Sequence, residues 1–209
     1  RSENTERNCL MNLEFWFSVG STYTTLTVMR MNEIERLHNI TLRLMPFSVR
    51  RVMLDMDNVP FPASKASKVT YMWRDIERRA AIYGFPVKVP APYPLQEFDR
   101  ANKIAFVGAQ EGWIKDYVLQ TYKNWFQRGL EAGGDENLKA TFKTLSLDVK
   151  EILARSQTSE IDKLYEEQTS VAVKKGIFGS PTFIVGEEVF WGDDRLEDAI
   201  SWLKNQSKS

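Results

Sequence analysis

Residues 176–185 read GIFGSPTFIV, and the rest of the chain is best understood outward from this stretch. The apolar run from Thr182 to Val185 has the composition of a buried strand, and Pro181 stands directly before it. Proline lacks an N–H group, so it suits the first position of a strand and not its middle. An X-Pro bond is also the only kind that adopts the cis form cheaply, usually in a tight turn. We therefore predict a cis bond between Ser180 and Pro181 that leaves backbone groups free to pair with an extended peptide.

A second motif follows this strand closely. Residues 192–196 read GDDRL, which is a glycine turn, two acidic residues and the beginning of an amphipathic helix. Acidic residues are favoured in the first turn of a helix because the helix dipole is positive there. Apolar residues at positions 196, 199, 200 and 203 then fall on one helical side. The C-terminal part is thus predicted as a strand, a hairpin to residues 189–191 and a last helix.

The N-terminal part reads as a strand, a helix and a second strand. Residues 13–19 are predicted as a buried first strand, and residues 40–49 as the second. Ser21 or Thr22 can cap the helix between them, since a hydroxyl accepts hydrogen bonds from the free N–H groups at a helix start. Residues 53–63 are predicted as a loop, because Asp, Asn and Pro break any regular period there.

The apolar spacing between residues 64 and 175 is helical. Ser64 is predicted to cap a long helix that ends at Gly84, and the four prolines of residues 85–94 predict a loop. Further helices are predicted over residues 101–111, 113–132, 136–144, 148–155 and 160–175. Asp75 stands three and four residues before Arg78 and Arg79, a spacing that suits surface ion pairs. We interpret the aromatic residues around positions 125 and 126 as core or dimer contact, and not as a substrate site.

Composition excludes several classes of protein. Lys and Arg together number 28, as do Asp and Glu, so no global positive field attracts nucleic acid or an anionic membrane. No apolar run is long enough to span a bilayer. One cysteine, Cys9, and one histidine, His38, rule out a disulfide framework within the chain, a C-x-x-C redox pair and a zinc site of the usual type. We therefore expect no metal, no nucleic-acid partner and no membrane association.

The first residues differ from the rest. Residues 1–10 are polar and patternless, and Met11 directly precedes the first strand. We expect translation to begin naturally at Met11, with residues 1–10 as an upstream extension outside the fold. Glu14 interrupts what would have to be the apolar core of a signal peptide, so we expect a cytoplasmic protein.

The motifs G-x-F-G-x-P-T-F-x-V and W-G-x-D-R-L resemble those of the 2-hydroxychromene-2-carboxylate isomerase family, whose relatives are kappa-class glutathione transferases and DsbA-like oxidoreductases. The resemblance covers essentially all of residues 11–204. It implies an α/β fold, namely a thioredoxin-like domain with an inserted all-helical subdomain. The two halves of the domain would be residues 11–63 and 176–209, and the helical insert residues 64–175. The resembled enzymes are commonly dimers, so we expect a homodimer.

The resemblance also implies a glutathione site after the first strand. The family has D-F-x-S-P-Y there, with a serine that contacts the glutathione sulfur. Ser21 and Tyr23 match the serine and the tyrosine, whereas Ser18 and Thr22 replace the aspartate and the proline. By this match Ser21 is catalytic, and it binds the cofactor glutathione together with Thr22 and Tyr23. From the residue alone, Ser21 is more simply a helix cap, but the resemblance favours a hydroxyl that donates to a glutathione thiolate.

Four further positions match the family's contacts with glutathione. Asp193 and Asp194 match a pair near the γ-glutamyl amine, with simple helix capping as the alternative for either. Ser180 and Pro181 would offer backbone groups to the cysteinyl part, in the manner of a paired strand.

Three more positions match near the second strand. Asn58 matches an asparagine that faces the ligand, although a turn residue explains it equally well. The isomerases carry a cationic residue in this region that meets the substrate carboxylate. Arg50 and Arg51 are the two candidates, and the sequence does not choose between them.

The resemblance implies a glutathione-dependent isomerase that acts on a small aromatic substrate. A glutathione thiolate would add to the substrate, permit bond rotation and leave again. One alternative is a kappa-like glutathione transferase, which consumes glutathione. Another is a thioredoxin-like scaffold that binds peptides or thiols without catalysis, which the replacements at Ser18 and Thr22 keep open. A DsbA-like redox function is disfavoured, because the chain lacks the necessary cysteine pair.

Overall fold

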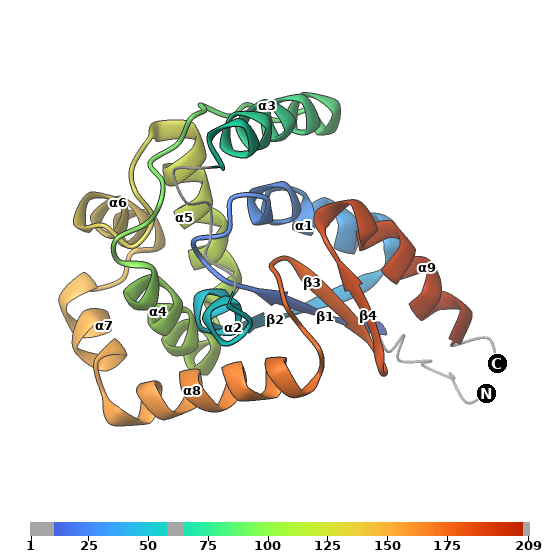
Figure 1. Ribbon diagram of the computed structural model, residues 1–209. Coiled ribbons are helices and arrows are strands. Elements are labelled where there is room, and N and C mark those ends of the chain that lie inside the picture. The colour runs from blue at the N-terminus through green and yellow to red at the C-terminus, as the bar shows by residue number, and fades with distance from the viewer. Residues whose placement is uncertain (1–10, 58–64, 207–209) are drawn as a thin grey trace, which may run out of the picture.

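The computed structural model describes residues 11–57 and 65–206, and a four-stranded mixed sheet lies at its centre (Figure 1). The strands are β1 (Met11–Phe17), β2 (Ile40–Pro46), β3 (Thr182–Val185) and β4 (Glu188–Trp191), in the spatial order β2-β1-β3-β4. β1 pairs with β2 in parallel and with β3 antiparallel, and β3 pairs with β4 antiparallel. The predicted α/β arrangement of a thioredoxin-like fold is confirmed.

The helices fall into three groups along the chain. α1 (Thr24–His38) connects β1 to β2. Between β2 and β3 come α2 (Val49–Asp55), α3 (Ala66–Tyr83), α4 (Phe98–Glu111), α5 (Ile114–Arg128), α6 (Asp135–Leu145), α7 (Val149–Ser156) and α8 (Ser159–Lys174). After β4 come the short 3-10 helix η2 (Asp193–Arg195) and α9 (Leu196–Gln206). The exact division into a domain and an insert stays a prediction, and the predicted cap Ser64 lies outside the described residues.

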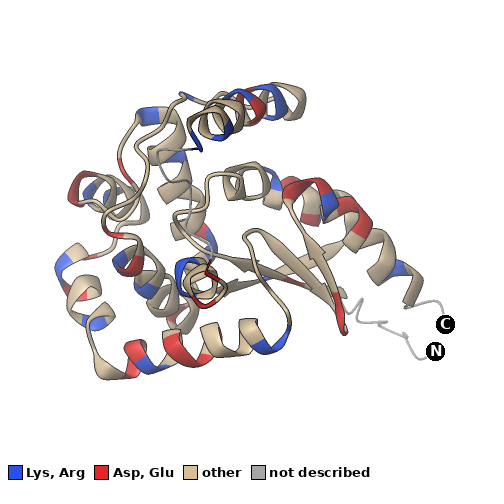
Figure 2. Ribbon diagram, viewed as in Figure 1, with Lys and Arg blue, Asp and Glu red and all other residues tan. Residues whose placement is uncertain are grey.

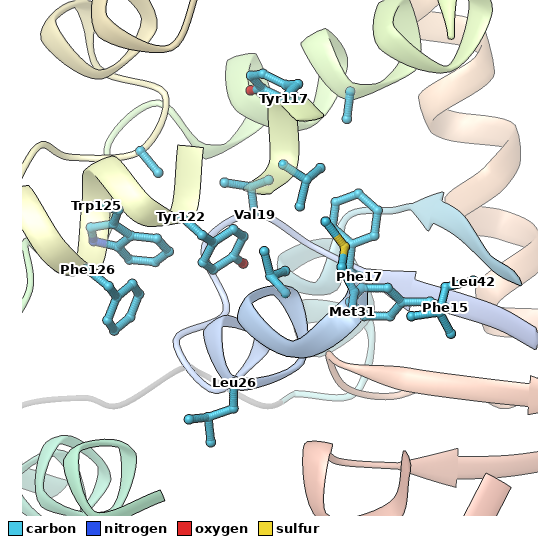
Figure 3. Packing of buried hydrophobic residues seen from close by; sticks show 14 of the residues in the cluster. Phe15, Phe17, Val19, Leu26, Met31, Leu42, Tyr117, Tyr122, Trp125 and Phe126 are labelled. Atoms are coloured by element: carbon cyan, nitrogen blue, oxygen red, sulfur yellow. The ribbon is translucent and has the colours of Figure 1, made fainter. Parts of the chain in front are cut away.

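Alternate residues of β1 pack on opposite faces of the sheet, as strand geometry requires. Phe15 and Phe17 enter the larger core together with Leu26 and Met31 of α1 (Figure 3). Residues of α5 and α9 also line this core. Trp16 packs on the other face against Phe47 and residues of α2 and α8. Both faces of the sheet are therefore buried under helices. In the part of the chain that the structure describes, no helix is long and apolar enough to cross a membrane.

α2 is a helix that the sequence analysis did not predict. The strand predicted over residues 40–49 ends at Pro46, and residues 53–55, predicted as part of a loop over residues 53–63, belong to α2. Residues 58–63 of that predicted loop lie outside the described residues. The side chain of Ser48 caps α2 by accepting a hydrogen bond of 3.3 Å from the backbone N–H of Arg51. A proline that closes a strand and a serine two residues later together signal the start of a helix. The apolar residues that follow are too few to show a helical period, so this signal was not recognised.

The aromatic side chains of α5 belong to the core. Tyr122, Trp125 and Phe126 are fully buried, and the rings of Trp125 and Phe126 lie 4.7 Å apart between centroids (Figure 3). These residues were a possible dimer contact, but they are buried within a single chain. They therefore do not support the expected homodimer.

Basic and acidic residues are mixed along the helices (Figure 2).

Candidate active site

The turn between β1 and α1 is held by side chains from distant parts of the chain. The backbone N–H of Ser18 donates to Oγ of Ser180 at 2.9 Å. Oγ of Ser18 accepts from the N–H of Val49 at 3.3 Å, and Ser18 is 1% exposed. Asn102 of α4 binds both the N–H and the carbonyl of Val19, at 2.8 and 3.0 Å. Ser18, which stands where the resembled family has aspartate, therefore serves to shape this turn.

Two of the residues that support the turn were missed by the sequence analysis. Asn102 is fully buried, and Tyr122 donates its hydroxyl to the carbonyl of Ser21 at 3.0 Å. One signal was present in the sequence. Asn102 lies four residues from Phe98 and from Phe106, so it is a polar residue on the apolar side of its helix. Buried polar groups are nearly always hydrogen-bonded, so such a residue indicates a structural contact.

Ser21 does not cap α1, so that expectation was wrong. The residue at the cap position is Tyr23, which makes no side-chain cap bond. The Ser21 hydroxyl instead donates to the carbonyl oxygen of Ser180 at 2.7 Å, beside a Ser180–Pro181 bond that is cis as predicted. α1 has no acidic residue in its first turn, so none offsets the positive end of the helix dipole there. The Ser21 hydroxyl, which donates a hydrogen bond, and the positively polarised start of α1 thus both lie at the turn that Ser180 and Pro181 form.

The two residues after Ser21 contact α3. Thr22 is 5% exposed, and its hydroxyl lies 2.9 Å from the sulfur of Met72, so Thr22 also does not cap α1. The Tyr23 hydroxyl donates to Oδ2 of Asp75 at 2.9 Å. Burial, and after it the Asp75 carboxylate, raises the pKa of Tyr23 well above its ordinary value. Tyr23 is therefore a neutral hydrogen-bond donor that is already directed at a carboxylate.

Asp193 belongs to a buried polar network and is 5% exposed. Its Oδ1 accepts from Nη2 of Arg30 at 2.9 Å and from the hydroxyl of Thr27 at 2.8 Å. Its Oδ2 accepts from the hydroxyl of Tyr83 at 3.0 Å. Burial, followed by the Asp193 carboxylate, raises the pKa of Tyr83 to about 12. The carboxylate that the sequence match assigned to glutathione is therefore occupied by the protein's own groups.

Asp194 has a different environment, because it is exposed and lines a cavity. Gly192 precedes it with φ of +109°, a backbone conformation that side chains other than glycine rarely adopt. A Cβ atom on Gly192 would lie 2.5 Å from Oδ1 of Asp194. Glycine is therefore required both for the turn and for the close approach of the Asp194 carboxylate.

The cavity has a volume of about 420 Å³, within the range usual for small-molecule sites. It brings together α1, α3, the proline turn and the turn before η2. Its polar and turn residues include Tyr23, Asp75, Arg79, Ser180, Pro181 and Asp194. Of the eight predicted glutathione contacts, the cavity wall includes Tyr23, Ser180, Pro181, Asp193 and Asp194, whereas Ser21 and Thr22 are not among its lining residues. The wall adds Asp75 and Arg79, which were predicted to be surface charges.

The two candidate arginines lie in different surroundings. The guanidinium of Arg50 lies 3.6 Å above the centre of the Phe98 ring and donates to the carbonyl of Leu95 at 3.4 Å. Leu95 and Phe98 in turn lie against Gly20, where an added Cβ would contact them at 3.8 and 3.6 Å. Arg50 is therefore close to the turn that carries Ser21.

Arg51 is directed to another part of the protein. Its guanidinium forms an ion pair of 3.8 Å with Glu166 of α8, and about half of its side chain is exposed. Asn58, the remaining predicted contact, lies outside the described residues. The structure thus favours Arg50 over Arg51 as the arginine near the site.

Residues 12–203 match the family described as the DSBA-like thioredoxin domain. A 2-hydroxychromene-2-carboxylate isomerase from Pseudomonas putida is 26% identical over 201 residues, covering 94% of this chain and 98% of the relative. Glutathione S-transferase kappa 1 from Rattus norvegicus is 23% identical over 198 residues, covering 88% and 87%. A solved structure of a 2-hydroxychromene-2-carboxylate isomerase has a TM-score of 0.82 and 25% identity, covering 95% of this chain and 98% of that one. The resemblance inferred from the motifs is confirmed, and with it the prediction of an enzyme.

Proposed function

The chain belongs to the DSBA-like thioredoxin domain family, and we propose that it is a glutathione-dependent isomerase of the 2-hydroxychromene-2-carboxylate isomerase type. The observation that carries this proposal is the contact of Ser21 with Ser180. The Ser21 hydroxyl donates to the Ser180 carbonyl at 2.7 Å, and Ser180 and Pro181 line the cavity. A glutathione molecule that lies along the proline turn would therefore bring its sulfur close to Ser21.

Ser21 acts in this proposal as a hydrogen-bond donor to a thiolate. An extended peptide beside Ser180 can donate its own N–H to the Ser180 carbonyl, as in strand addition. The Ser21 hydroxyl, which has one proton to donate, is then free to turn to the glutathione sulfur. The dipole of α1 favours an anion at the same position. Ser21 is not a protease-type nucleophile, because the only histidine, His38, ends α1 at the opposite end of the helix.

The reaction proceeds by formation and cleavage of one carbon–sulfur bond. The thiolate adds to an unsaturated carbon of the substrate, and the former double bond becomes free to rotate. Expulsion of the thiolate restores the double bond in the new geometry, so glutathione is recovered unchanged. Arg50, close to the Ser21 turn, would hold the carboxylate of the aromatic substrate.

A kappa-like glutathione transferase is the second candidate, favoured by the relative from Rattus norvegicus. In that reaction the carbon–sulfur bond persists and glutathione is consumed. Both candidates use the same binding site for glutathione, so the product distinguishes them. A scaffold without catalysis is the third candidate, and it predicts no turnover.

Incubation with 2-hydroxychromene-2-carboxylate and glutathione, followed by chromatography and mass spectrometry, tests the proposal. We expect a free isomer, an unchanged amount of glutathione and no enzymatic conversion when glutathione is omitted. A stable conjugate would establish the transferase instead. Absence of saturable glutathione binding in a calorimetric titration would leave only the scaffold.

We further propose that the enzyme is a homodimer in the cytoplasm, as the resemblance and Glu14 led us to expect. Sedimentation velocity at micromolar concentration checks the first statement, because a monomer there would contradict it. Fractionation of the source cells checks the second.

A further inference from the structure

The chain between β1 and α1 forms a tight turn whose middle is buried. The N–H of Ser21 donates to the carbonyl of Ser18 at 3.1 Å, which closes a β-turn over residues 18–21. Val19 is fully buried, and Gly20 has φ of +122°. The peptide between the two central residues of a β-turn can face either way, and glycine accepts both forms. A group outside the turn is therefore needed to fix this peptide.

The side-chain amide of Asn102, on α4, binds Val19 as a neighbouring strand would. Its Oδ1 accepts from the N–H of Val19 at 2.8 Å, and its Nδ2 donates to the Val19 carbonyl at 3.0 Å. Nδ2 also donates to the carbonyl of Phe98 at 2.9 Å, so the amide is itself held in one orientation. Because its donor and its acceptor are different atoms, the amide selects one orientation of the peptide between Val19 and Gly20.

Tyr122, on α5, holds the other half of the turn (Figure 3). Its hydroxyl donates to the carbonyl of Ser21 at 3.0 Å and lies 3.3 Å from the carbonyl of Ser18. Burial is the first cause that raises the pKa of Tyr122, so the hydroxyl keeps its proton and remains a donor. Two helices that lie between β2 and β3 in the chain therefore fix the backbone on both sides of Gly20.

The direction of the Ser21 hydroxyl depends on this backbone, because the Cβ that carries it has a fixed place on its Cα. The hydroxyl donates to the carbonyl of Ser180 at 2.7 Å, on the turn along which glutathione lies in the proposed function. We propose that Asn102 and Tyr122 are positioning residues for catalysis, which act through Ser21 by fixing the turn that directs its hydroxyl to the glutathione sulfur. Both are fully buried, so neither contacts glutathione or the substrate. The inference rests on the proposed function, because that function gives the Ser21 hydroxyl its thiolate.

Loss of this positioning should change the sulfur more than the binding of glutathione. Hydrogen bonds weaken steeply as their distance and angle depart from the optimum, and a misplacement of about 1 Å can lower a rate about a hundredfold. Asn102→Ala and Tyr122→Phe should therefore each raise the pKa of the bound thiol by about 1 and lower kcat about tenfold. The dissociation constant of glutathione should stay within about twofold of the wild-type value.

A double-mutant cycle with Ser21→Ala separates positioning from a purely structural role. Residues that act through one group lose their separate effects once that group is removed. In the Ser21→Ala background, Asn102→Ala and Tyr122→Phe should therefore raise the thiol pKa no further and lower kcat no further. Thiolate absorbance of bound glutathione against pH, together with steady-state kinetics, provides both readouts.

Asn137→Ala is the matched control, because Asn137 of α6 is also fully buried and binds backbone carbonyls through its amide. It donates to the carbonyls of Thr121 and Leu130, at 3.1 and 2.9 Å. Asn137→Ala should lower the stability, as Asn102→Ala does, but leave the thiol pKa, kcat and glutathione affinity as in the wild type.

The inference is overturned if folded Asn102→Ala and Tyr122→Phe keep the wild-type thiol pKa and kcat, or if their effects add in full to that of Ser21→Ala. Should Asn102→Ala fail to fold by circular dichroism, Tyr122→Phe decides alone, since it removes a single oxygen atom. If the wild type binds no glutathione, or if Ser21→Ala by itself changes neither readout, the proposed function fails, and the inference with it.

Discussion

Arg30 of α1 and Asp193 of η2 form a buried ion pair, with 2.9 Å between Nη2 and Oδ1 and only 9% and 4% of the two side chains exposed. The ring of Tyr83, from α3, covers the guanidinium of Arg30 with 3.8 Å between the guanidinium carbon and the ring centre. The pair and the Tyr83 ring therefore join α1, α3 and the turn before α9 at the wall of the cavity, which Asp193 itself lines. Asp193 is thus held in the interior by the protein's own groups, whereas its neighbour Asp194 is exposed in the same cavity.

Asp193→Ala should destabilise the folded protein strongly. The substitution leaves the Arg30 guanidinium buried with Glu197 as its remaining ion-pair partner. Loss of one member of a buried pair lowers the free energy of unfolding by about 3–5 kcal/mol. Asp194→Ala, at an exposed position, should change it by less than about 0.5 kcal/mol. Urea denaturation followed by circular dichroism makes the comparison, and equal stability of the two variants would contradict it.

Gly192→Ala should reduce glutathione binding by displacing Asp194. The new Cβ would stand 2.5 Å from Oδ1 of Asp194, in a turn with φ of +109°. Gly84→Ala is the matched control, because Gly84 has φ of +82° and nothing within 4 Å of an added Cβ. Both variants should lose about 1–3 kcal/mol of stability through backbone strain. Only Gly192→Ala should raise the glutathione dissociation constant, and an equal effect of both on binding would show that Asp194 is not involved.

Arg50→Gln should raise KM for the aromatic substrate, while Arg51→Gln should not. Arg50 lies on the Phe98 ring close to the Ser21 turn, whereas Arg51 pairs with Glu166 on α8. Loss of a hydrogen bond between charged groups corresponds to about tenfold or more in KM. Glutathione affinity should stay unchanged in both variants. Steady-state kinetics with varied substrate checks this, and a raised KM in Arg51→Gln alone would reverse the choice of arginine.

The order of helices and strands was predictable because the residues that begin and end these elements can be recognised from the local sequence. α3 ends at Gly84 as predicted, where the backbone is left-handed, and Pro181 stands at the predicted start of β3. The spacing of the hydrophobic residues likewise predicted the ends of the long helices to within a few residues. α2 was missed because its seven residues, Val49–Asp55, are too short for that period to be visible beside Pro46.

The site was predictable only in part, because folding brings together residues that are far apart in the sequence. Arg30 and Asp193 are 163 positions apart, and nothing in the local pattern of α1 distinguishes Arg30 from a solvated cation. Asp75 was predicted to form surface ion pairs with Arg78 and Arg79: the pair with Arg78 is confirmed, at 3.4 Å, whereas among the described residues no ion pair forms between Asp75 and Arg79. The role of Ser21 in binding sulfur came from the resemblance and stays a prediction.

Alkaline pH should unfold the protein cooperatively. Burial is the first cause that raises the pKa of six tyrosines, to about 12 for Tyr83 and above the ordinary value for Tyr23, Tyr93, Tyr117, Tyr122 and Tyr165. The unfolded chain releases these protons near pH 10, so above that pH it binds fewer protons than the folded chain. Stability therefore falls as pH rises above 10. The absorbance of these six phenolates and the circular dichroism should change together, and formation of all six phenolates in an intact fold would contradict this.

Ser21→Ala should act on the glutathione sulfur more than on binding. It removes the hydroxyl that lies 2.7 Å from the Ser180 carbonyl but leaves the beginning of α1 intact. The pKa of the bound thiol should rise by about 1 to 2 through loss of one hydrogen bond to an anion. Fewer bound molecules are then thiolates at neutral pH, so turnover should fall by about tenfold or more and its pH dependence should move upward.

Thiolate absorbance of bound glutathione against pH measures this effect directly. Ser21→Thr retains a hydroxyl and should restore most of the wild-type curve. Ser21→Cys should be a poor replacement, because a second thiol competes to be the anion and can form a mixed disulfide with glutathione. Superimposable curves for the wild type and Ser21→Ala would show that Ser21 only links its turn to Ser180, and that the sulfur is activated elsewhere or not at all.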